Sequence, residues 1–272
     1  METANARAER CGCGWLAPPV FFVLFTAALF AVWLAAEPSW IAANFDAGGY
    51  SPFELATLPF YAALVPLVWL RCPFGGSALR RRTLCAMVSV VAVMAIVKET
   101  DLHVAFLHWA YPSHVGADGT LLPGLFKPNG DPLTGTPFKM RVLTNAAVPF
   151  GMKAFAVMYF ALFFGTFAAG FAYLFPEWLR GVFALRADAW AVGCFGASGV
   201  MVQIADRLPS WLRGASACGE KMEPSMKALC TVLEEGGEMA IAVFAILAIL
   251  AGHAERRRLE AAETVSAGGS AA

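Results

Sequence analysis

Six stretches of the chain are apolar and long enough to cross a lipid bilayer, which takes about 20 residues of helix. They cover residues 16–36, 54–70, 84–110, 148–176, 187–206 and 229–252. The third stretch is apolar only to Val97 and then becomes polar, although the residues as far as Ala110 are still compatible with a helix. The second contains Pro59 and Pro66, which a membrane helix tolerates because neighbouring helices satisfy the backbone groups that proline frees. The pattern predicts an all-α polytopic membrane protein with six transmembrane helices.

The composition agrees with this fold class and excludes two others. Of the 272 residues, 58% are hydrophobic and 15% are charged, whereas soluble domains average about 25% charged residues. Twenty Lys and Arg balance twenty Asp and Glu, so the formal net charge is zero. This balance excludes a basic nucleic-acid-binding protein and an acidic disordered chain. Membrane lipids are therefore the expected partners, and nucleic acid is not.

Dense arginine clusters predict the orientation in the membrane. Residues 80–82 and 256–258 are three arginines each, in short segments beside predicted spans, and short cationic loops stay in the cytoplasm. We therefore expect both termini in the cytoplasm. The first apolar stretch exceeds the 7–15 residues of a signal-peptide core, which favours a retained anchor.

The chain is expected to form one membrane domain. Residues 1–15 are predicted to be a cytoplasmic N-terminus, residues 16–253 the six-helix domain, and residues 254–272 a disordered cytoplasmic tail. A loop at residues 111–137, dense in Pro and Gly, is expected to cap the outer end, because loops of this length in compact proteins are usually functional or disordered.

Charged residues associated with the spans gather at one predicted level, near the outer face. They lie at the start of the second span, the end of the third, the end of the fifth and the start of the sixth: Glu54; Lys98, Glu99, Asp101 and His103; Asp206; Glu234, Glu235 and Glu238. Ionisable groups inside a membrane are costly and are often functional. Their convergence predicts a shared polar site.

Helical spacing suggests what this site does. Glu99 and His103 are four residues apart, and Glu235 and Glu238 are three apart, so each pair shares one helix face. Carboxylates with an imidazole can bind a divalent cation such as Zn, Mn or Fe. We expect these four residues as metal ligands, with Asp101 and Glu238 as the catalytic residues.

Three cations near the same level are candidates for binding an anionic head group: Lys98, Lys139 and Arg141. Arginine is especially suited to this because its guanidinium binds phosphate in a bidentate way. The alternative is structural, because charges at helix ends often only extend into the interface. Likewise, acids are favoured in the first turn of a helix by its dipole.

Cys218 and Cys230 both fall on the predicted outer side. A disulfide between them is chemically permitted in an oxidising compartment, and two free thiols are the alternative. The chain lacks the phosphate-binding loop, the dinucleotide fingerprint, the nucleophile elbow and the H-E-x-x-H zinc motif, which leaves those mechanisms without support.

Three short motifs occur together in a characteristic order. Lys98-Glu99-x-Asp101-x-His103 ends one span, Ala205-Asp206-Arg207 ends a later one, and Leu233-Glu234-Glu235-x-x-Glu238 opens the last. In this the chain resembles a group of uncharacterised bacterial polytopic inner-membrane proteins, over about half its length. The resemblance implies a location in a bacterial inner membrane and a polar site at these positions, and no particular reaction.

Three functions are compatible with these features. The first is a metal-dependent enzyme acting on a lipid or lipid-linked substrate. The second is a non-catalytic scaffold or assembly factor, in which the charges form an ion-pair network that fixes the helices. The third is a transporter that couples protons or cations to the same acids, which would need polar residues along a path across the membrane.

Overall fold

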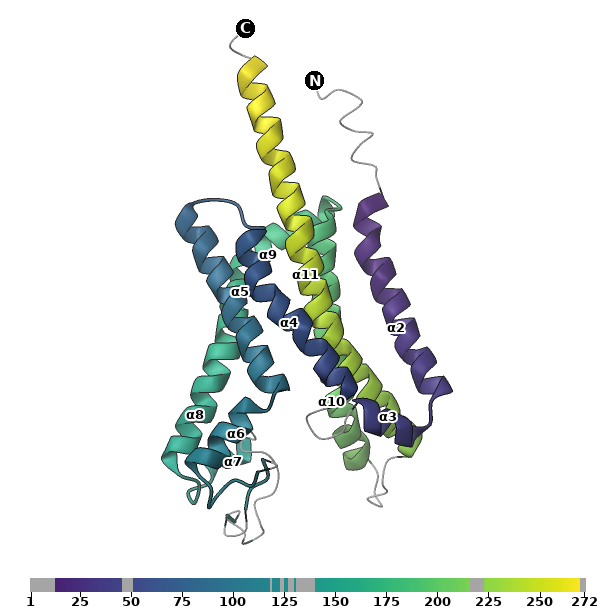
Figure 1. The fold of residues 1–272 in the computed structure, drawn as a ribbon, viewed down its shortest axis with the longest axis vertical. Coiled ribbons are helices and arrows are strands. Elements are labelled where there is room, and N and C mark those ends of the chain that lie inside the picture. Colours follow the sequence, from purple (N-terminus) through teal and green to yellow (C-terminus); the bar gives the residue numbers. More distant parts are fainter. Residues whose placement is uncertain are drawn as a thin grey trace.

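The computed structural model describes residues 13–45, 51–117, 119–122, 125–126, 130, 140–215 and 223–269. Within them the secondary structure is helical, apart from turns and isolated β-bridge residues, among them Val115 paired with Leu121 (Figure 1). The elements are η2 (Cys13–Leu16), α2 (Ala17–Ala35), α3 (Pro38–Phe45), α4 (Pro52–Leu70), α5 (Ala78–Glu99), α6 (Leu102–Ala110), α7 (Met140–Thr144), α8 (Phe150–Phe160), the π-helix η3 (Ala161–Gly165), α9 (Thr166–Phe183), α10 (Ala187–Ala215) and α11 (Pro224–Gly269).

Among the described residues, five helical segments are individually long and apolar enough to cross a membrane. They are Gly14–Ala35, Pro52–Leu70, Phe150–Phe183, Ala187–Pro209 and Pro224–Ala262, and α5 with α6 makes a sixth if this bent pair is one span. Large apolar side chains also point away from the bundle, as on α2, where Leu24 is 63% and Leu34 is 75% exposed. Such a surface suits lipid rather than water. The protein is a multi-pass integral membrane protein.

The predicted third span, 84–110, is broken rather than straight. α5 ends at Glu99, α6 begins at Leu102, and the two helices meet at an angle of 68°. Asp101 lies at the bend with a φ of 50°, in the left-handed region, where Asp is tolerated better than most residues. Because the Asp101 amide donates to the carbonyl of Lys98, the helical pattern ends here.

A capping box fixes the start of α4. The Ser51 hydroxyl accepts a hydrogen bond from the Glu54 amide at 3.1 Å, and a Glu54 carboxylate oxygen accepts one from the Ser51 amide at 2.7 Å. Pro52 occupies the first turn, where its missing N–H costs nothing. These contacts define where α4 begins and hold Glu54 in its first turn.

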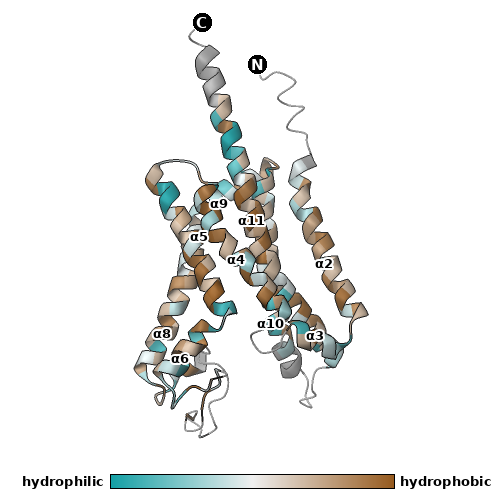
Figure 2. Cartoon of the chain, in the orientation of Figure 1, coloured by the Kyte–Doolittle hydropathy of each residue, from teal (hydrophilic) through white to brown (hydrophobic). Residues whose placement is uncertain are grey.

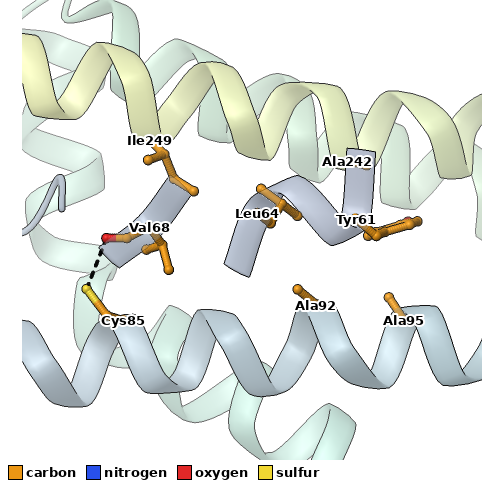
Figure 3. Packing of buried hydrophobic residues seen from close by; sticks show 8 residues of the cluster. All are labelled: Tyr61, Leu64, Val68, Cys85, Ala92, Ala95, Ala242 and Ile249. Carbon is orange, nitrogen blue, oxygen red and sulfur yellow. Dashed lines mark hydrogen bonds between the residues drawn. The ribbon is translucent and has the colours of Figure 1, made fainter. Parts of the chain in front are cut away.

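Glycines on α11 allow close packing with two neighbouring helices. A Cβ added at Gly237 would lie 2.5 Å from Val202 Cγ2 of α10, and one added at Gly236 would overlap Leu29 of α2. A hydrophobic cluster fills the contact between α4, α5 and α11 (Figure 3). α11 is therefore the helix around which α2, α4 and α10 pack.

A smaller hydrophobic cluster lies beyond α6. Leu107 of α6 packs with Val115 and Leu121 of the following turn and with Val148 and Met152 around the start of α8. The described part of the predicted loop 111–137 therefore folds against α6 and α8. Residues 131–139 lie outside the described residues.

The predicted disordered tail 254–272 is instead a continuation of α11 as far as Gly269. The chain there is rich in Ala, Glu, Arg and Leu, which are good helix formers. Arg256 and Glu260 also lie 3.7 Å apart at i,i+4. Figure 2 shows a hydrophilic stretch of α11 beyond the apolar part of the bundle, before the part of the helix drawn in grey. The start of α2 lies at the same end (Figure 1), and its location in the cytoplasm stays a prediction.

Candidate functional site

A polar cavity of about 190 Å³ lies at the start of α4 and the end of α5, beside the first part of α11. Seven residues line it: Glu54, Lys98, Glu99, Asp101, His103, Glu235 and Glu238. All seven were predicted from the sequence to belong to one polar site. They come from segments far apart in the chain: the first turn of α4, the end of α5 with the bend and the start of α6, and the first part of α11.

The centre of the cavity is a group of three carboxylates. One oxygen each from Glu99, Glu235 and Glu238 lies within 4.8 Å of the other two. The three-residue spacing of Glu235 and Glu238 places both on one face of α11, opposite Glu99 at the end of α5. Glu238 is only 8% exposed, so this negative charge is partly removed from solvent.

Lys98 is the cation among the lining residues. Its ammonium nitrogen lies 3.1 Å from Glu99 Oε1 and also donates to Glu238 Oε1. The Lys98 side chain is 50% exposed, compared with 5% for Glu99 and 11% for Glu238. The lysine therefore reaches inward from the exposed side of the cavity onto two buried carboxylates.

No hydrogen bond or ion pair joins the Glu235 carboxylate to another described residue. One ammonium thus faces three carboxylates. If all are ionised, the group carries two uncompensated negative charges.

His103 has a defined orientation. Its Nδ1 lies 3.1 Å from the carbonyl oxygen of Val97, and because a carbonyl can only accept, Nδ1 carries the hydrogen. Its ring stacks on Tyr159 of α8 with centroids 5.4 Å apart. A backbone carbonyl is a common partner for the nitrogen opposite the ligating one in metal-binding histidines.

Two tyrosines that sequence reasoning missed support the site. The hydroxyl of Tyr61 on α4 donates to the backbone carbonyl of Glu238 at 3.0 Å. The hydroxyl of Tyr159 donates to the carbonyl of Met94 on α5 at 3.3 Å, and its ring holds His103. Both lie within apolar stretches, where nothing in the sequence distinguishes them from other aromatic core residues.

Some predicted residues lie elsewhere. Asp206 is exposed on α10 and is not among the residues that line the cavity. Its Oδ2 lies 3.4 Å from Arg207 Nε. Lys139 lies outside the described residues, and Arg141 belongs to α7 with a side chain outside the described part of the structure. Cys230 is buried on α11, whereas Cys218 is outside the described residues, so their disulfide stays a prediction.

Glu54 has a local structural role in addition to lining the cavity. One of its oxygens accepts the Ser51 amide, so the capping box accounts for its position. Glu99, Glu235 and Glu238 are the group that could hold a metal ion, and His103 lines the same cavity; carboxylate oxygens and imidazole nitrogen suit Mn, Fe and Zn.

Comparisons of the chain with protein-family models, with curated proteins and with solved structures found no match.

Proposed function

We propose that the polar cavity binds a divalent cation and that the protein is a metal-dependent enzyme acting on a lipid or lipid-linked substrate. The observation that supports this most strongly is the close approach of Glu99, Glu235 and Glu238 within one cavity. Three carboxylates from two helices would repel one another at this distance unless protons or a cation balanced them. Lys98 supplies one positive charge, and a divalent cation supplies the two that remain.

The chain's own residues have distinct roles in this proposal. Glu99, Glu235 and Glu238 provide oxygen ligands, and His103 provides a nitrogen ligand oriented by Val97 and Tyr159. Asp101, at the bend beside them, is the candidate proton acceptor. A bound divalent cation would make its water molecule acidic enough to act as a nucleophile near neutral pH.

The size and surroundings of the cavity favour a small polar group as ligand. A volume of about 190 Å³ is below the ~300–1,000 Å³ of pockets that enclose whole drug-sized molecules. The cavity suits an ion together with part of a head group. Most of its lining residues belong to helices long and apolar enough to span a membrane, which favours a membrane lipid as substrate, and the half-exposed Lys98 can pair with an anionic substrate group.

A second candidate function, a non-catalytic scaffold, is favoured by one observation. Lys98 contacts both Glu99 and Glu238, and Tyr61 joins α4 to α11 at the same level. A buried ion-pair network of this kind can fix helix register without binding any ligand. The two functions differ in whether a cation binds.

A transporter is less well supported. Beyond Tyr61, the contact of α4 with α5 and α11 is filled by Leu64, Val68, Ala92 and Ile249 (Figure 3). These side chains offer no group that could relay a proton or hold a cation along that contact.

Elemental analysis of full-length protein, purified in detergent without chelator, tests the proposal. We expect a transition metal in the wild type and in Asp206→Asn, which removes an acid outside the cavity. We expect it to be lost in the double variant Glu235→Gln/Glu238→Gln. Equal metal content in all three proteins, or none in the wild type even after loading with Mn²⁺ or Zn²⁺, would support the scaffold instead.

A further inference from the structure

A second group of reactive side chains lies at the opposite end of α4 and α5 from the polar cavity. Cys72 follows α4 by two residues, and Cys85 lies eight residues into α5. Their sulfur atoms are 3.6 Å apart. They are 13 positions apart in the chain, and the segment between them includes the loop that joins the two helices.

Neighbouring contacts hold this pair in place. The thiol of Cys85 donates to the carbonyl of Val68 at 3.3 Å (Figure 3), and the thiol of Cys72 lies 3.8 Å from the carbonyl of Phe74. The chain around Cys72 also packs on α11, since His253 Nδ1 lies 3.5 Å from the Cys72 carbonyl oxygen. The two sulfurs therefore face each other as a consequence of how α4, α5 and α11 pack.

We propose that Cys72 and Cys85 form a reversible dithiol–disulfide pair. A disulfide needs a sulfur–sulfur distance of about 2.05 Å, so the sulfurs must approach by about 1.5 Å. Rotation of the Cys72 side chain, which lies outside the helix, can supply much of this. The site is independent of the cation site in the polar cavity and does not rest on the function proposed for it.

The oxidation needs an external disulfide as oxidant, such as oxidised glutathione or the disulfide of a redox protein. Cys72 is partly exposed and lies beyond the end of the predicted span, whereas Cys85 is only 3% exposed. The Cys72 thiolate attacks the external disulfide, forms a mixed disulfide and releases one thiol. The Cys85 thiolate then attacks the Cys72 sulfur, forms the internal disulfide and releases the second thiol. Two protein thiols are oxidised by two electrons, and the external disulfide is reduced to two thiols.

The disulfide would tie the end of α4 to the start of α5. Both helices carry residues of the polar cavity at their other ends, so oxidation would restrict how they move relative to one another. If this end lies in the cytoplasm, as the arginine clusters predict, the bond is expected to be transient, because reducing conditions there remove structural disulfides.

Thiol trapping on the full-length protein in native membranes tests this proposal. Samples are treated with oxidised glutathione or dithiothreitol, acid-quenched, alkylated in SDS and analysed by peptide mass spectrometry. We expect a peptide linked through Cys72 and Cys85 after oxidation, and its loss after dithiothreitol. In parallel, a background with Cys11, Cys13, Cys194, Cys218 and Cys230 changed to Ser should lose two alkylation sites on oxidation.

In that background, Cys85→Ser should stop at a mixed disulfide on Cys72, and Cys72→Ser should leave Cys85 unreacted. The wild-type peptide measurement stands even if a variant fails to fold. Oxidation that leaves only a glutathione adduct on Cys72 in the wild type, or links Cys72 to a cysteine other than Cys85, would overturn the proposal. So would full alkylation of both cysteines after prolonged exposure to oxidised glutathione.

Discussion

At the residue scale, the defining feature of the polar cavity is the excess of acid over base. Lys98 lies on the same carboxylates that a cation would use. It therefore stabilises the cluster when no cation is bound and competes with a cation when one is present. An ion-pair network and a cation site therefore give different predictions for how replacing Lys98 changes Mn²⁺ binding.

Replacing Lys98 with Gln should strengthen cation binding and lower the stability of the cation-free protein. The substitution removes a positive charge that repels the cation and occupies its ligands, while it leaves Glu99 and Glu238 without their partner. We expect Mn²⁺ affinity to rise several-fold and the thermal midpoint in the presence of chelator to fall, measured by titration and by thermal unfolding in detergent. If the midpoint falls while Mn²⁺ has no measurable effect on Lys98→Gln, the lysine has only a structural role.

Asp101 combines a backbone role with a side-chain role, and two substitutions separate them. Glycine accepts the left-handed conformation at the bend, whereas a β-branched residue does not. Asp101→Val should therefore be less stable than Asp101→Gly by about 1–2 kcal/mol. Chemical or thermal unfolding of both variants measures the difference. Equal stabilities would show that the bend does not depend on this conformation.

At the element scale, hydropathy predicted where the membrane helices lie, because about 20 apolar residues in a row are unmistakable. It missed the break at Asp101, since Lys98, Thr100 and His103 are all compatible with a helix. It also missed α3 and the extension of α11 to Gly269, which depends on helix propensity rather than on hydrophobicity. The sequence predicted that Glu99, Glu235 and Glu238 lie together, as the structure has them, but it also placed Asp206 in the same polar site, where it does not lie.

The difference between Asp206 and the acids of the cavity shows why the sequence could not predict which acids at this level point into the cavity. Depth in the membrane follows from position in the sequence, but direction around the helix axis depends on packing. Glu235 and Glu238 face α5 because the neighbouring Gly236 and Gly237 let α11 approach α2 and α10 on its other sides. Asp206 lies on an exposed face of α10, and no pattern in the sequence distinguishes that face.

The close approach of α10 and α11 at Gly237 gives a prediction for packing. Gly237→Val places methyl groups where Val202 and Met201 already lie, and overpacking of this kind costs about 2 kcal/mol. We expect the thermal midpoint to fall by roughly 4–8 °C. The matched control is Gly193→Val on α10, where an added Cβ meets no atom within 4 Å. A similar loss in both variants would attribute the effect to helix propensity instead.

At the scale of the whole molecule, the chemistry is divided between the two ends of the bundle. Carboxylates, an imidazole and Lys98 gather at one end of α4, α5 and α11. The arginine clusters 80–82 and 256–258 and the Cys72–Cys85 pair lie toward the other, with an apolar cluster between the two ends of α4 and α5. The zero net charge of the chain therefore does not describe either end.

A cation that joins α5 to α11 should stabilise the whole fold. A ligand at 100 times its dissociation constant stabilises the folded state by about 2.7 kcal/mol, which corresponds to roughly 5–10 °C in the thermal midpoint. We expect this increase in the wild type and its reversal by chelator. Glu235→Gln should show little of it. An equal increase in Glu235→Gln would place the stabilising cation elsewhere.

The most direct test of the cation site is a Mn²⁺ titration of the purified full-length protein followed by electron paramagnetic resonance, which distinguishes free from bound Mn²⁺. Our account predicts one bound ion per chain in the wild type and in Asp206→Asn, with affinity weakened by about tenfold or more in Glu235→Gln and in Glu238→Gln. If the wild type binds no Mn²⁺ more tightly than these two variants do, the carboxylate cluster is not a cation site and the account is contradicted.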